Sequence, residues 1–133
     1  MIFKNHRGKE IKVAKANKYK IDWDSGCRSK IQKQVKDILY KYWKGDLVYE
    51  EFPVAGTRLT LDFYNASCNI AIEVDGMQHY QYNEFFHNKN RNNFLEQLKR
   101  DDFKESFCST NSITLYRIRE DKNVQEQINN LKL

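Results

Sequence analysis

The chain has 133 residues, with 23 lysines and arginines against 18 acidic residues and a net charge of +5. That length supports one domain with one hydrophobic core. No apolar run approaches the roughly 18 residues of a transmembrane helix, and the N-terminus lacks the apolar segment of a secretory signal. Cys27, Cys68 and Cys108 form no CxxC pair, which argues against a zinc ribbon or a disulfide framework. We therefore expect an intracellular, cytoplasmic protein without a membrane partner.

The positive charge is concentrated at the N-terminus, where the first 20 residues carry a single acid, Glu10. The cations of this segment are Lys4, Arg7, Lys9, Lys12, Lys15, Lys18 and Lys20. Such a segment, taken as residues 1–22, predicts a basic arm that contacts the phosphate backbone of a nucleic acid. The alternative is a solvated, partly disordered tail that keeps the protein soluble. Residues 23–133 are then expected to form a single domain.

The first strong helix is predicted over residues 27–44. Its apolar residues recur at the spacing of one buried stripe, and they are Ile31, Val35, Ile38, Leu39, Tyr42 and Trp43. Asp24 or Ser25 is suited to cap its N-terminus, and Lys44 followed by Gly45 is suited to end it. Three strands follow, over residues 47–52, 58–64 and 69–75.

The second half of the chain predicts an irregular loop over 80–93, a helix over 92–108, a strand over 113–118 and a helix over 124–131. The expected core residues of the longer helix are Leu95, Leu98, Phe103 and Phe107. The loop is rich in asparagine and aromatic residues, which can read adenine edges or stack on bases. A three-strand meander with a helical crossover to a fourth strand predicts an α/β fold. Its mixed central β-sheet is flanked by helices, in the order α-β-β-β-α-β-α.

Carboxylates interrupt the two apolar strands 58–64 and 69–75. Alternation places Leu61 and Phe63 on one face of the first strand and Asp62 on the other, and it places Glu73 and Asp75 on one face of the second. If these strands pair as a hairpin, Asp62 and Glu73 become neighbours, and their repulsion is relieved by a divalent cation, Mg²⁺ above all. The alternative is an ordinary solvated polar face.

The residues after the second strand add to this pattern. Gly76 permits a sharp turn, and Gln78 and His79 follow it. A histidine just beyond a strand that carries carboxylates is suited to act as a general base or to position water. Cations that hold phosphates and carboxylates that hold a metal are together typical of nucleic-acid hydrolases.

In this order, four segments resemble the restriction-endonuclease-like, or PD-(D/E)XK, nuclease superfamily. The segments are LDF at 61–63, AIEVDGMQH at 71–79, KRDDFKESFC at 99–108 and ITLYRI at 113–118. Within the superfamily, the similarity is to the branch of the very-short-patch repair endonuclease and related phage and homing endonucleases. It covers residues 28–118.

The resemblance implies a restriction-endonuclease-like fold and a Mg²⁺-dependent endonuclease that acts on double-stranded DNA, with Mn²⁺ able to substitute. Asp62 and Glu73 would bind the metal. Asp75 stands where the family has a lysine and could itself become a ligand, so Gln78, His79 or Lys104 would take over the role of that lysine. Cutting both strands would need a homodimer or two sequential events.

Other interpretations stay open. A structure-specific nuclease, such as a junction resolvase or repair nuclease, has the same fold, and so would a DNA-binding module without activity. Arg100 shares a helix face with Lys104, so it either contacts the cleaved strand or joins a surface ion-pair cluster. For Glu50 and Glu51 we favour a solvated edge over a place in the site.

Overall fold

The computed structural model describes residues 1–76 and 84–133; of residues 84–91, 93 and 94 it describes the helical backbone alone. Four strands form one mixed sheet in the order β3-β4-β5-β6. Their bounds are Val48–Pro53, Thr60–Asn65, Ile70–Asp75 and Thr114–Arg119. The first three form an antiparallel meander, and β6 runs parallel to β5. The predicted mixed α/β architecture is confirmed.

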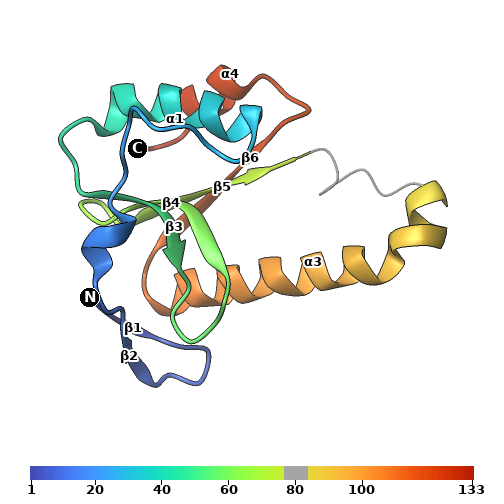
Figure 1. Cartoon of the computed structure of the whole chain (residues 1–133), viewed down its shortest axis with the longest axis horizontal. Coiled ribbons are helices and arrows are strands. Elements are labelled where there is room, and N and C mark those ends of the chain that lie inside the picture. Colours follow the sequence, from blue (N-terminus) through green and yellow to red (C-terminus); the bar gives the residue numbers. More distant parts are fainter. Residues whose placement is uncertain (77–83) are drawn as a thin grey trace.

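Helices cover both faces of this sheet (Figure 1). Helices α1 (Lys30–Trp43) and α4 (Val124–Asn129) lie on one face, and α3 (Glu84–Thr110) lies on the other. Each face has its own cluster of buried residues. The α1-side cluster includes Val35, Leu39, Trp43, Phe63, Ile72, Ile118 and Ile128. The α3-side cluster includes Phe3, Tyr49, Phe52, Leu61, Tyr64 and Phe107. None of the described helices combines the length and hydropathy needed to cross a membrane.

Helix α1 follows the predicted stripe, with two differences. Its N-cap is Ser29, whose hydroxyl accepts a hydrogen bond from the Gln32 amide at 3.2 Å, so neither Asp24 nor Ser25 caps it. Tyr42 is 44% exposed, and its hydroxyl donates to Asn129 at the surface. The helix ends where predicted, and Gly45 follows with a φ of 90° that favours glycine.

The N-terminal segment is a folded hairpin rather than a free tail. Strands β1 (Ile2–Lys4) and β2 (Glu10–Lys12) pair antiparallel, and a short 3₁₀ helix, Ala16–Tyr19, follows them. Phe3 is 7% exposed, and its ring lies 5.6 Å from that of Phe107 on α3. All seven cations of the segment are exposed to solvent. The segment is therefore anchored in the α3-side core while its charges remain available.

Helix α3 is longer than predicted. It begins at Glu84, so the loop expected over 80–93 is helical from residue 84 on, and residues 80–83 lie outside the described residues. The span 84–110 has no glycine or proline, and asparagine disfavours helix only weakly, so a helix once nucleated propagates through it.

The core residues expected on α3 are only partly confirmed. Phe107 is 2% exposed and Phe103 is half-buried, whereas Leu95 and Leu98 are each 44% exposed. Figure 1 shows the reason: the C-terminal part of α3 lies against the sheet, and its N-terminal part extends beyond the sheet.

Candidate active site

The strand β4 does not alternate as predicted. Leu61 packs with Tyr64 in the α3-side cluster, whereas Phe63 packs in the α1-side cluster, so the expectation that Leu61 and Phe63 share a face is wrong. The irregularity coincides with Glu51, which lies opposite Asp62 in the register of β3 and β4 and has a φ of 52°. A left-handed residue in the middle of a strand interrupts the regular pleat on which alternation depends.

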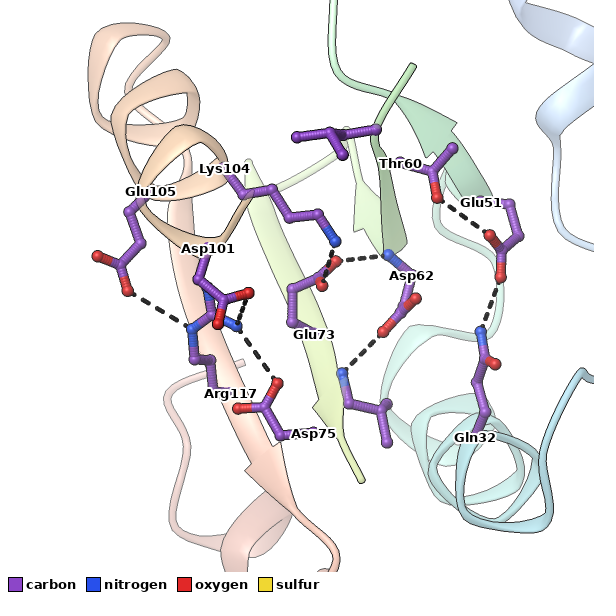
Figure 2. Close-up of polar contacts among 12 residues, drawn as sticks. Gln32, Glu51, Thr60, Asp62, Glu73, Asp75, Asp101, Lys104, Glu105 and Arg117 are labelled. Atoms are coloured by element: carbon purple, nitrogen blue, oxygen red, sulfur yellow. Dashed lines mark hydrogen bonds and ion pairs between the residues drawn. The ribbon is translucent and has the colours of Figure 1, made fainter. Parts of the chain in front are cut away.

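The two acids at the centre of the site link β4 to β5. Their backbone pairing runs as far as Phe63 and Ile72. Beyond it, the Asp62 amide donates to Glu73 Oε1 at 2.8 Å, and the Val74 amide donates to Asp62 Oδ2 at 2.8 Å. Each carboxylate thus accepts a hydrogen bond from the backbone of the other strand, as Figure 2 shows. The predicted proximity of Asp62 and Glu73 is confirmed.

Burial makes this pair electrostatically unusual. Glu73 is 4% exposed, and Asp62 is half-buried. Burial, and then the charge of Glu73, raise the pKa of Asp62 to about 7. Burial also raises the pKa of Glu73, although Lys104 acts in the opposite direction. At neutral pH the pair therefore gains from a nearby cation.

One such cation comes from α3. The Lys104 ammonium lies 2.8 Å from Glu73 Oε2, and the lysine side chain is only 15% exposed. Lys104 is one of the three candidates for the role of the family lysine, and it is the one that the structure brings to the carboxylates. The other two, Gln78 and His79, lie outside the described residues.

Asp75 lies on β5 but contacts a different partner. Its Oδ1 is 3.3 Å from Arg117 NH1, and the same guanidinium reaches Asp101 and Glu105 of α3, each at 3.5 Å. Burial opposes the charge of Arg117, but these carboxylates, Asp101 first, raise its pKa. Arg117 therefore remains a cation beside Asp75.

Glu51 belongs to this region, although the sequence pattern does not place it there. Gln32 Nε2 donates to its Oε1 at 2.9 Å, Thr60 Oγ1 donates to its Oε2 at 3.1 Å, and Arg28 NH2 lies 3.1 Å from the same Oε2. Figure 2 places Glu51 beside Asp62, and its charge acts on the pKa of that residue. Hydrophobic periodicity does not predict its position, because the left-handed backbone of Glu51 interrupts the regular alternation of the strand.

The conformation of Glu51 is costly. A left-handed backbone costs a non-glycine residue on the order of 1–3 kcal/mol, whereas an exposed ion pair such as that with Arg28 contributes about 0–1 kcal/mol. The hydrogen bonds that Gln32 and Thr60 donate to the Glu51 carboxylate offset part of this cost.

Glu50, the neighbouring acid, has a structural partner. Its Oε1 lies 3.1 Å from Nζ of Lys36, whose side chain is fully buried and also donates to Ser25 Oγ at 2.9 Å. Glu50 and Glu51 are therefore both engaged with partners, and the solvated edge favoured for them is wrong.

Two carboxylates are a sufficient protein contribution for Mg²⁺. Among the residues that the structure describes, no three histidine, cysteine or acidic side chains group as a preformed metal cage. Mg²⁺ dehydrates reluctantly and is usually held by one or two carboxylates together with substrate phosphates and water. Asp62 and Glu73 match that donor set, since both supply hard oxygen ligands and carry unfavourable charge at neutral pH.

The remaining nucleic-acid candidates are Arg100 and the cations of the hairpin. Arg100 is 60% exposed and lies 3.6 Å from Glu96 one turn away, as expected of a surface ion pair. The hairpin approaches α3 at His6, whose ring lies 4.9 Å from Phe103, the residue before Lys104. The hairpin therefore contacts α3 one residue away from Lys104.

Comparison with known proteins finds viral relatives of undescribed function. No model of a protein family matches the chain, and no solved structure matches it significantly. Uncharacterized protein 033L of Invertebrate iridescent virus 3 is 33% identical over 66 residues, and uncharacterized protein 094L of Frog virus 3 is 38% identical over 66 residues. Each match covers 50% of this chain, but 34% and 43% of the two relatives. The chain thus spans less than half the length of these relatives.

Proposed function

We propose that the protein is a Mg²⁺-dependent DNA endonuclease of the restriction-endonuclease-like class, which hydrolyses phosphodiester bonds and also accepts Mn²⁺. The observation that carries this proposal lies where the pairing of β4 and β5 ends. There Asp62 is hydrogen-bonded to β5, and Lys104 contacts Glu73. Two acids and a lysine are the groups that the resemblance requires. Here the lysine comes from α3, because Asp75 occupies the position of the family lysine on β5.

Each residue has a separable task in this reaction. A divalent cation, when bound, polarises the phosphate and lowers the pKa of an attacking water. Asp62 and Glu73 supply the oxygens that hold that cation. Lys104 stabilises the negative charge that develops on the phosphate oxygens, because its ammonium is held beside Glu73 with little exposure to water. His79 is the candidate general base.

The substrate proposal rests on charge. The exposed cations of the hairpin suit a polyanionic ligand, and attraction to the phosphate backbone of double-stranded DNA supplies affinity that falls with salt. The relatives are proteins of viruses, which fits a nuclease that works in the cytoplasm of an infected host cell.

The test compares cleavage of plasmid DNA by the wild type, Asp62→Asn and a control, Asp37→Asn, in Mg²⁺, Mn²⁺ or EDTA. Asp37 is an exposed acid paired with Lys33 on α1. We expect the wild type and the control to cut with either metal. Asp62→Asn should fold and bind DNA without cutting it. Full activity in EDTA, or in folded Asp62→Asn, would overturn the proposal.

The same assay separates the alternatives. Binding without cleavage by the wild type in every metal would indicate a DNA-binding module of this fold. A strong preference for mismatched or four-way substrates over linear duplex would indicate a structure-specific nuclease.

A further inference from the structure

The strain at Glu51 has a distinctive location. Four non-glycine residues of the described chain have a positive φ, and they are Lys15, Glu51, Asn69 and Ser112. Of these four, Glu51 is the one that lies inside a strand; the others lie in connections. Strained backbone persists where the surroundings determine it, and it concentrates at functional sites.

The neighbours of Glu51 fix the position of its carboxylate. Gln32 donates from α1 and Thr60 donates from β4, so both carboxylate oxygens accept hydrogen bonds from neutral groups that are buried or half-buried. The carboxylate therefore has a fixed position before Arg28 is considered. Figure 2 shows it between these two donors and next to Asp62.

Arg28 is the solvent-exposed partner of this fixed carboxylate. Its side chain is 78% exposed, and one nitrogen, NH2, lies 3.1 Å from Glu51 Oε2. A guanidinium has five donors in a planar fork, and the part of the chain that the structure describes offers no second acceptor to Arg28. Glu51 therefore contacts the guanidinium at one nitrogen, and its other donors can bind a phosphate in a bidentate manner.

We propose that Arg28 contacts a substrate phosphate on the α1 side of the active site, and that Glu51 is the residue that positions it. The proposal rests on the proposed nuclease function. It adds a contact on the face of the sheet opposite the hairpin, whose Phe3 packs toward α3. DNA would then be held from both faces, with Asp62 and Glu73 between the two contacts.

The experiment measures binding of a fluorescent DNA duplex as a function of salt, without metal, and single-turnover cleavage with Mg²⁺. The variants are Arg28→Ala, Arg28→Lys and Lys33→Ala. Lys33 is the matched control because it is a nearby cation of α1 whose partner is Asp37, outside the site. Arg28→Ala should reduce the slope of log K against log salt by about 0.9, the value of one phosphate contact.

The remaining variants distinguish a direct contact between Arg28 and the phosphate from the positioning of Arg28 by Glu51. Arg28→Lys should restore the salt slope but not the cleavage rate, because an ammonium lacks the bidentate fork. Glu51→Gln should keep the slope and lower the rate. Glu51→Gly removes the carboxylate that contacts Arg28, so it should also lower the cleavage rate.

The outcomes are distinguishable. A wild type that binds and cuts DNA beside an Arg28→Ala variant with unchanged slope and rate would overturn this inference and leave the nuclease proposal standing. A wild type that neither binds nor cuts DNA would overturn both. Lys33→Ala should have the salt slope and cleavage rate of the wild type. If both fall as far as in Arg28→Ala, the effect comes from the loss of any positive charge in this region, and the inference is overturned.

Discussion

Among individual residues, Asp62 differs clearly in its chemistry from an ordinary surface acid. Its pKa of about 7 lies above its usual value of 3.8, and the first cause is burial. The acid nevertheless accepts a hydrogen bond from the Val74 amide, so its position between the strands is fixed in either protonation state. A buried acid with a raised pKa that is held in place is typical of functional sites.

The pH dependence of unfolding tests this interpretation. Because the folded state raises the pKa of Asp62, protonation of this acid stabilises the folded protein. This stabilisation is fully present below about pH 4 and is lost as the pH rises through about 7. We therefore compare the free energy of unfolding of metal-free Asp62→Asn with that of the metal-free wild type. The difference should shift in favour of the variant between pH 5 and pH 8. One pKa unit corresponds to about 1.4 kcal/mol, so we expect a gain of at least about 1 kcal/mol in urea unfolding. Parallel pH profiles would contradict it.

Lys104 provides the second prediction for a single residue. Lys104→Met keeps the length of the side chain and removes its charge, so cleavage should slow at least about 10²-fold, as expected when a transition-state interaction is removed. DNA affinity should change little, because the lysine is largely buried against Glu73. Single-turnover kinetics measure the rate. Lys99→Met removes an exposed cation of α3 as the control, and equal rates for both variants would exclude Lys104 from the mechanism.

At the level of secondary-structure elements, the β1–β2 hairpin combines an apolar anchor with exposed charge. Phe3 contributes to the α3-side core, and a β-carbon on Gly56, in the turn after β3, would lie 3.1 Å from Ile11 of the hairpin. The hairpin is thus packed on both α3 and the β3–β4 turn. Deleting the hairpin to test DNA binding would also remove core packing. The test must therefore change the charges of the hairpin and leave its fold intact.

The corresponding prediction uses a triple substitution to glutamine at Arg7, Lys9 and Lys12, all exposed. The slope of log K against log salt should fall by about 0.9 for every phosphate that the altered hairpin no longer neutralises, with thermal stability near that of the wild type. A control set consists of glutamine at Lys41, Lys44 and Lys132, also exposed. Equal slopes in the two triple variants would show that the hairpin makes no preferred interaction with DNA.

For the molecule as a whole, metal binding should appear as folding stability. A ligand that binds only the folded state stabilises it by about 2.7 kcal/mol at 100 times its dissociation constant. Mn²⁺ or Mg²⁺ should therefore raise the unfolding temperature of the wild type in the absence of DNA. Asp62→Asn should show no such increase, because it lacks one of the two proposed acidic ligands. An equal increase in both proteins would place the cation elsewhere.

The order of helices and strands after residue 23, and the proximity of two acids, follow from local sequence patterns. Hydrophobic periodicity is a local property, so a stripe such as Val35, Leu39 and Trp43 predicts a buried face without knowledge of its partner. The short connection between β4 and β5 likewise fixes their pairing, and with it the approach of Asp62 to Glu73.

The surroundings of those acids depend instead on the folded chain. Lys104 reaches Glu73 across 31 positions of sequence, because α3 crosses the face of the sheet that Glu73 occupies. Glu51 joins the site through a left-handed backbone that no periodicity predicts, and Phe3 anchors a segment whose charge alone suggests a free arm. These features depend on contacts between distant elements, and such contacts form only when the whole chain buries its apolar surface together.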